Sequence, residues 1–96
     1  MRQVFIRGQS GAGPDAAAQA EQAMQAATRL LAARGARIAD ICKVTTYVTD
    51  RAYDAPVQAV VARHLGGAEV AETALIVNGL TRPEMMVEID IDAVIA

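Results

Sequence analysis

The sequence predicts an α+β fold, in which two helices pack on one face of a mixed β-sheet. Its 96 residues fit one domain, spanning residues 1–96. Four segments have the alternation or the β-branched composition of strands, and two others repeat apolar residues at helical spacing. Their order is strand, helix, strand, helix, strand, strand, and the last pair suggests a closing hairpin.

The first strand is expected over residues 2–7, with Val4 and Ile6 on one face and Phe5 on the other. Residues 8–14 hold three glycines and a proline, a composition typical of turns. A phosphate-binding loop is the alternative, but the GxxxxGK[ST] pattern and a nearby lysine are missing, so a turn is favoured. The start of the following helix is a second, weaker candidate for anion binding.

The first helix is expected from Asp15 to Arg34. Pro14 and Asp15 suit a helix start, because proline fits the first turn and an acid complements the positive helix end. Gly35 lies where a left-handed C-terminal cap belongs. An apolar stripe at helical spacing marks the buried face. It comprises Ala20, Ala23, Met24, Ala27, Leu30 and Leu31.

Residues 41–48 are rich in β-branched residues and apolar on both faces, which predicts a central strand. Cys42 has apolar neighbours in it and is expected to be a buried, unreactive thiol. Asp50 can cap a second helix from Ala52 to Leu65, with Pro56 in or near its first turn. The buried face of this helix is expected to hold Tyr53, Val57, Val60, Val61 and Leu65.

The third strand is expected from Thr73 to Leu80, followed by a turn over residues 81–84. The fourth strand, Met86 to Val94, alternates strictly, so one face is apolar and the other acidic. The apolar face holds Val87, Ile89, Ile91 and Ala93, and the acidic face holds Glu88, Asp90 and Asp92.

Composition excludes several classes of function. Nine basic and 11 acidic residues give a net charge of −2, and the pI is near 5.2, which argues against a nucleic-acid partner. No apolar run approaches the roughly 20 residues of a membrane span, and the N-terminal segment does not resemble a secretory signal. One cysteine permits neither an internal disulfide nor a Cys-rich zinc site, so a reducing, cytoplasmic location is expected.

The chain is also poor in large side chains, since aromatic residues make up only 3% of it. A domain of this size buries only about 60–65% of the surface of its unfolded chain. Without a disulfide or a metal, association of several copies is the route to stability that the composition favours. The sequence therefore predicts a subunit of a homo-oligomer, with no cofactor.

Three carboxylates on one strand face, Glu88, Asp90 and Asp92, could bind a metal or supply a general acid or base. A charged, solvated face is the alternative, and it is favoured for Asp90 and Asp92 because no converging metal ligands are evident. His64 could serve a nucleophile, but its place near a helix end favours capping or surface exposure.

Arg7, Arg51 and Arg82 are candidate clamps for a carboxylate, because the guanidinium fork matches carboxylate geometry. Each is equally well explained as a surface arginine.

Several segments together resemble the RidA/YjgF family. Arg7-Gly8-Gln9 resembles its SGQ strand end, and residues 18–23 resemble the start of its first helix. Residues 40–50, DICKVTTYVTD, resemble its DIVKTTVYVTD segment. Residues 79–90, GLTRPEMMVEID, resemble its C-terminal strand. The resemblance covers nearly the whole chain.

This resemblance implies a chorismate-mutase-like fold and a homotrimer with ligand clefts between subunits. It also implies hydrolysis of enamine or imine intermediates to a keto acid and ammonia. In such a scheme an arginine binds the substrate carboxylate and a glutamate positions water. Glu88 matches the family glutamate, and Gly8 matches the pocket glycine.

The sequence departs from the family at three places. Glu72 stands where the substrate-binding arginine is expected, and Gln58 stands where an asparagine is common. Residues 10–14 replace a strand, which shortens the N-terminal hairpin. Because Glu72 would repel a carboxylate, Arg7 or Arg82 is the candidate replacement clamp.

Two hypotheses follow for the function. The first is a small-metabolite deaminase of the imine-hydrolysing type, with Glu88 as the catalytic residue. The second is a non-catalytic binding or regulatory trimer, in which Glu72 and Glu88 near one cleft favour a cationic ligand. The acidic pI makes a ribonuclease role improbable.

Overall fold

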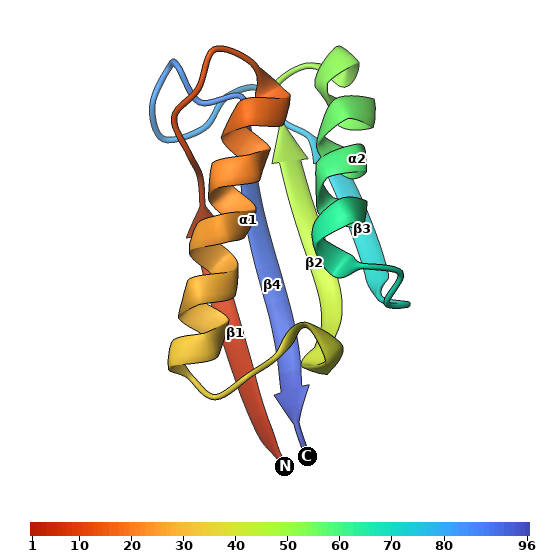
Figure 1. Cartoon of the computed structure of the whole chain (residues 1–96). Helices are drawn as coiled ribbons and strands as arrows, with labels where there is room; N and C mark the ends of the chain where they lie inside the picture. The colour runs from red at the N-terminus through yellow and green to blue at the C-terminus, as the bar shows by residue number, and fades with distance from the viewer.

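A computed structural model describes residues 1–96 and has the predicted fold class, α+β with a mixed sheet. Figure 1 shows both helices on one face of a four-stranded mixed sheet, with the two chain ends close together. The elements are β1 (Arg2–Gln9), α1 (Ala16–Ala33), β2 (Ile41–Val48), α2 (Asp54–Leu65), β3 (Ala71–Ile76) and β4 (Val87–Ile95). Short 3-10 turns at Ile38–Asp40 and Arg51–Tyr53 precede β2 and α2.

The strand order is β1-β4-β2-β3, so the predicted closing hairpin is wrong. β3 pairs in parallel with β2, and β4 pairs antiparallel with both β1 and β2. The reason is burial: β4 has the most completely buried apolar face and takes a central position, whereas β3 is largely exposed and lies at the edge. β3 also ends at Ile76 rather than at Leu80, because residues 77–86 cross over to reach β4.

The strict alternation predicted for the last strand is confirmed. Val87, Ile89 and Ile91 are completely buried beneath the helices, while the acidic residues between them are half-buried on the opposite face. Met24 and Leu31 of α1 pack into the same core. One set of β4 side chains therefore builds the core, and the other is presented on the helix-free face.

Both predicted aspartates act as caps, but Asp50 caps the 3-10 turn at Arg51–Tyr53 that leads into α2, so α2 itself begins at Asp54 and not at Ala52. The Asp15 carboxylate accepts a hydrogen bond from the Ala18 amide at 2.8 Å, and the Asp50 carboxylate accepts one from Ala52 at 2.8 Å. Gly35 adopts a φ of +79° just after α1, as expected of a left-handed cap. Leu30 departs from the predicted stripe and is 41% exposed, because it lies about 100° around the helix from buried Leu31.

The glycine-rich segment after β1 is a packed turn. A Cβ atom at Gly11 would lie 2.7 Å from the Gln19 carbonyl oxygen and would collide with the Gln22 side chain. Glycine is thus required for the close approach of the loop to α1. No extra strand forms between β1 and α1.

Gln19 is a buried polar residue of α1 that connects three segments. Its side-chain oxygen accepts a hydrogen bond from the Met86 amide at 2.8 Å. Its amide nitrogen donates to the carbonyls of Gly13 at 3.2 Å and Glu84 at 3.1 Å. These bonds attach the glycine-rich turn and the crossover segment to one helix, just before β4 begins.

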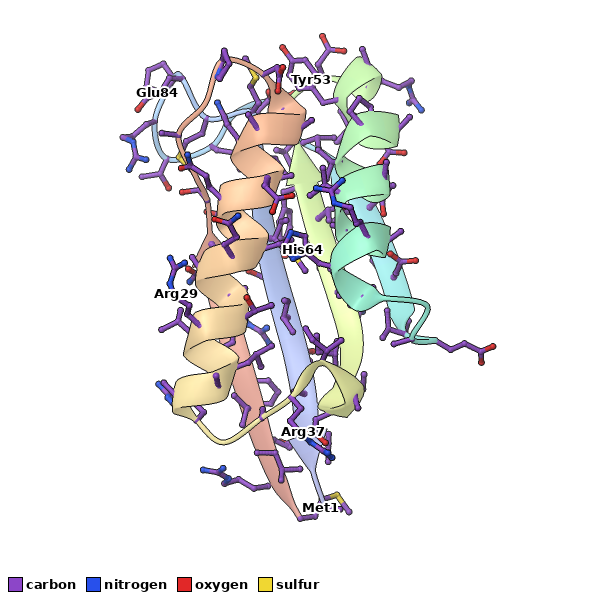
Figure 2. The ribbon with its side chains drawn as sticks, in the orientation of Figure 1. Met1, Arg29, Arg37, Tyr53, His64 and Glu84 are labelled. Carbon is purple, nitrogen blue, oxygen red and sulfur yellow. The ribbon has the colours of Figure 1, made fainter.

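His64 links the two helices instead of capping a helix or lying exposed. Its Nε2 atom lies 2.7 Å from a carboxylate oxygen of Glu21, and Arg63 pairs with the other oxygen. Figure 2 shows His64 between α1 and α2. The hydrogen bond to His64 is the main cause that holds the pKa of Glu21 below its usual value. Neither helix is long and apolar enough to cross a membrane.

Replacing Gln19 by alanine is expected to lower the free energy of unfolding by about 2–4 kcal/mol. The reason is that the buried Gln19 side chain makes three partly buried hydrogen bonds to backbone groups of Gly13, Glu84 and Met86, and the loss of such partners costs about 1–3 kcal/mol each before relaxation. Urea unfolding followed by circular dichroism measures the change. The exposed Gln25→Ala variant of the same helix is the control, expected within about 0.5 kcal/mol. Equal effects of the two substitutions would contradict this role.

Candidate functional site on the open face of the sheet

The side of the sheet opposite the helices, here called the open face, carries a group of polar side chains from three strands. β4 contributes Glu88, Asp90 and Asp92, β1 contributes Arg7, and β2 contributes Tyr47. The strand register brings them together, because Tyr47 lies opposite Glu88 and the end of β1 lies beside Asp90. No helix covers this face.

A β-bulge interrupts the pairing of β1 with β4 at this point. Ile6 pairs with Ile91 and Gln9 pairs with Ile89, so Arg7 and Gly8 together face a single residue, Asp90. Gly8 adopts a φ of +66°, a conformation that favours glycine. A Cβ atom at Gly8 would lie 3.6 Å from Oε1 of Glu88. The structure therefore brings Gly8 and Glu88 together.

Two of the three carboxylates on the open face have partners within the chain. One oxygen of Asp90 accepts the Gly8 amide at 2.7 Å, and the other accepts the Tyr47 hydroxyl at 3.0 Å. Asp92 forms an ion pair with Arg7. Glu88 forms no side-chain hydrogen bond or ion pair with the chain. Glu88 is thus the one carboxylate of the three whose oxygens have no partner within the chain.

These contacts raise the pKa values of the two donor side chains, Tyr47 and Arg7. The hydrogen bond to Asp90 is the main cause that raises the pKa of the Tyr47 hydroxyl above its ordinary value, and burial acts in the same direction. The hydrogen bond to Asp92 raises the pKa of Arg7, which keeps its guanidinium charged. Arg7 also lies over the Phe5 ring, 5.0 Å from its centroid.

Other predicted site residues lie elsewhere within one chain. Glu72 is an exposed residue of the edge strand β3 and pairs with Val44, whose side chain faces the helices, so it is on the opposite face from Glu88. Gln58 donates a hydrogen bond to Thr46 at 3.0 Å, which joins α2 to β2, and a second one at 3.2 Å to Asp54 of its own helix. The Glu72 and Glu88 carboxylates could share a cleft only across two copies of the chain.

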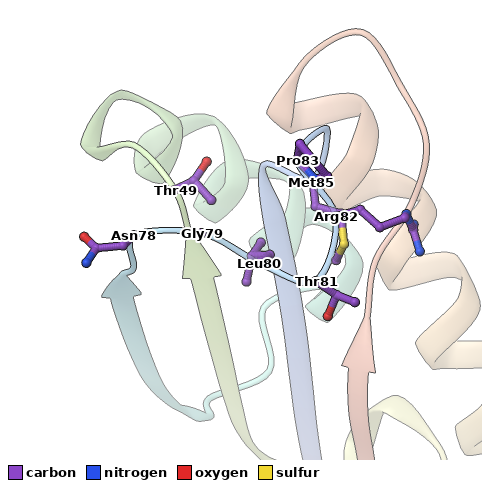
Figure 3. A pocket seen from close by; sticks show the side chains of 8 residues that line it. All are labelled: Thr49, Asn78, Gly79, Leu80, Thr81, Arg82, Pro83 and Met85. Carbon is purple, nitrogen blue, oxygen red and sulfur yellow. The ribbon is translucent and has the colours of Figure 1, made fainter.

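Arg82 belongs to a separate pocket in the crossover segment. This cavity of about 320 Å³ lies between the end of β2 and residues 78–85. Figure 3 shows the Asn78 and Arg82 side chains pointing away from each other. Arg82 pairs with Glu84 at 2.8 Å, and Arg51 is exposed in the turn before α2 without an ion pair. Neither arginine pairs with a carboxylate of β4, whereas Arg7 pairs with Asp92.

Cys42 is exposed, which corrects the predicted buried thiol. A bulge in β2 between Ile41 and Lys43 shifts the register against β4 and keeps Ile41 buried while Cys42 faces outward. Its Sγ atom contacts the Asp92 carbonyl at 3.4 Å. No group of three His, Cys, Asp or Glu side chains is arranged to hold a metal ion.

Sequence reasoning missed the roles of Tyr47 and Asp90. Asp90 was expected to belong to a solvated face, yet it joins β1 to β2 across β4. The available signal was weak: an alternating acidic strand and a tyrosine in a neighbouring strand, without knowledge that the two strands pair.

Comparison with known proteins identifies the family. The profile of the family described as Endoribonuclease L-PSP matches residues 2–95, so the chain belongs to this family, also called the YjgF/RidA family. A search of curated proteins finds no significant match.

Solved structures share the fold. Rv2704 from Mycobacterium tuberculosis, described as a YjgF/YER057c/UK114 family member, is 32% identical, with a TM-score of 0.93 over 97% of this chain and 79% of its own. YyfB from Yersinia pestis, described as a conserved Rid family protein of unknown function, is 28% identical, with a TM-score of 0.89 over 99% and 80%. A putative endoribonuclease from Thermotoga maritima is 24% identical and shares the fold, with a TM-score of 0.93 over 100% and 81%.

Because of the Tyr47–Asp90 hydrogen bond, the pKa of the Tyr47 hydroxyl is expected to lie above its ordinary value. In the Tyr53→Phe variant Tyr47 is the only tyrosine, and its ultraviolet titration midpoint should lie above 10.0. Adding Asp90→Ala should lower this midpoint, because the neutral phenol loses its acceptor and the phenolate loses a negative neighbour. An unchanged midpoint would show that the two groups do not interact.

Proposed function

We propose that this protein is a homotrimer that binds a small polar metabolite between its subunits and hydrolyses an imine or enamine to a keto acid and ammonia. The observation that carries the proposal is the free Glu88 carboxylate, held beside the Gly8 bulge on the face where Arg7 pairs with Asp92. Membership of the YjgF/RidA family agrees with it.

Association through the open face is supported by its exposed apolar groups. Phe5 is 52% exposed and Leu75 is 43% exposed, although both project from strands of the sheet. The helices bury only the opposite face, and a chain with few aromatic residues has little other apolar area to bury. A second copy of the chain is the occupant that would cover these groups and enclose Glu88.

Arg7 is the arginine best placed to bind a substrate carboxylate. Its ion pair with Asp92 uses Nη1 and leaves other N–H donors of the guanidinium free. The side chain is 54% exposed, so it is accessible while Asp92 and Phe5 fix its direction. Arg7 would thus supply the positive charge that Glu72 does not.

The chemistry needs one carboxylate and one water molecule. Glu88 accepts a proton from water as the water oxygen adds to the C=N carbon and returns this proton to the nitrogen, which gives a neutral carbinolamine. Glu88 then carries the hydroxyl proton of the carbinolamine to the nitrogen, so that the C=O bond forms as the C–N bond breaks and ammonia leaves a keto acid behind. Such general acid–base assistance is worth about 10²–10⁴-fold in rate.

A non-catalytic trimer that binds a cationic ligand is the second candidate, and the exposed acid Glu72 on the edge strand favours it. RNA cleavage fits less well, because the net charge is −2 and the open face carries three carboxylates. The single cysteine, which has no disulfide partner, is consistent with the proposed cytoplasmic location.

Sedimentation equilibrium at micromolar concentration is expected to give three times the chain mass of 10.1 kDa. Phe5→Asp should weaken association by about tenfold or more, because it places a charge in the proposed apolar contact. Leu30→Asp, a change of an exposed apolar residue on the helix side, is the control and should leave the mass unchanged. A wild-type monomer would refute the trimer.

Glu88→Gln is expected to lower the rate of ammonia and keto-acid release from freshly generated iminopropanoate by about 100-fold or more. Glu69→Gln, which changes an exposed glutamate outside the site, is the control and should match the wild type. Arg7→Gln should act mainly by raising KM, since it removes the carboxylate contact.

The two candidate functions give opposite results in one further measurement. Wild-type release at the uncatalysed background rate would reject hydrolysis. Thermal stabilisation by pyruvate but not by small amines would then count against a cationic ligand, and the reverse would support it.

A further inference from the structure

We infer that Asp90 is a positioning residue, which holds the Gly8 bulge in place beside Glu88 and so sets the geometry of the candidate site. This inference deepens the proposed function and rests on it for the reaction. It assigns Asp90 a role different from the solvated surface acid that its sequence context suggests.

The first step is the position of Asp90 in the sheet. The bulge places two β1 residues, Arg7 and Gly8, opposite this one residue of β4. An extra residue in a strand leaves a backbone group without its ladder partner. The Asp90 carboxylate supplies a partner, because its Oδ1 atom accepts the Gly8 amide at 2.7 Å.

The second step is that Asp90 is itself held in place. Its other oxygen accepts the Tyr47 hydroxyl at 3.0 Å, and Tyr47 comes from the strand on the opposite side of β4. The carboxylate therefore connects β1 to β2 across the central strand. Both of its oxygens are used inside the chain, so Asp90 is poorly suited to contact a substrate.

The third step is that the Asp90 carboxylate controls the position of the Gly8 backbone relative to Glu88. Gly8 requires a φ of +66°, and the space where its Cβ would stand is 3.6 Å from Glu88 Oε1. Release of the Gly8 amide would let this backbone move relative to the free carboxylate. Arg7 precedes Gly8 directly, so the proposed carboxylate contact would move with it. A displacement near 1 Å at such a site can cost about 100-fold in rate.

The test compares Asp90→Ala with Asp90→Asn. Both variants remove the charge, but only asparagine keeps an oxygen that can accept the Gly8 amide and an amide group that can donate to the Tyr47 oxygen. A difference between them therefore reports geometry and not charge. Glu69→Gln serves as the unaffected control.

Amide hydrogen exchange at Gly8 should be about tenfold or more faster in Asp90→Ala than in the wild type, and near the wild type in Asp90→Asn. Imine hydrolysis should fall by about 100-fold in Asp90→Ala, mainly in kcat, and be largely rescued in Asp90→Asn. Equal Gly8 exchange in the two variants, or equal turnover, would overturn the inference.

The inference can be tested even if the proposed function fails or if Asp90→Ala does not fold. If the wild type hydrolyses no imine, the proposed function fails, and Gly8 exchange still decides whether Asp90 fixes the bulge. If Asp90→Ala does not fold, amide exchange in the wild type provides the test. Exchange at Gly8 should be about tenfold or more slower than at Gly79, a loop glycine, and equal exchange at the two amides would overturn the inference.

Discussion

The central place of β4 is the constraint on which the rest of this structure depends. Because it pairs with β1 on one side and β2 on the other, its apolar residues lie under both helices. Its acidic residues are then forced onto the open face, between a strand that supplies Arg7 and Gly8 and a strand that supplies Tyr47. The core and the candidate site are thus two faces of one strand.

In this arrangement, the three neighbouring carboxylates of β4 have different partners. Asp92 pairs with Arg7, and Asp90 is used by Gly8 and Tyr47. Glu88 keeps its oxygens free and sits beside the one β1 residue without a side chain. Identical spacing along the strand therefore produces three different chemical environments, because each acid meets a different partner across the sheet.

Gln19, a buried polar residue of α1, also helps to position β4, although it lies outside the sheet. It holds the glycine-rich turn and the crossover segment against α1, and it accepts the amide of Met86 just before β4 begins. The start of β4, and with it the position of Glu88 along the sheet, is set by hydrogen bonds from a helix. Gln19 lies three residues after Ala16 and four before Ala23, at the border of the buried stripe, whereas Gln22 and Gln25 are exposed.

The elements themselves were largely predictable. Alternation identified β1 and β4, apolar spacing identified both helices, and Asp15, Gly35 and Asp50 were recognisable as caps because their effects are local. The errors concern position in space. The third strand was extended too far, Cys42 was expected to be buried, and His64 was not expected to join the helices through Glu21.

The sequence by itself determined the fold class, the order of elements and the acidic face that includes Glu88, because these follow from periodicity along the chain. It also pointed to the family. Only the tertiary structure decided that β4 lies between β1 and β2 and that Asp90 binds the Gly8 amide. It likewise placed Glu72 and Glu88 on opposite faces of one chain. These facts depend on strand pairing between residues far apart in sequence, and no local pattern encodes that pairing.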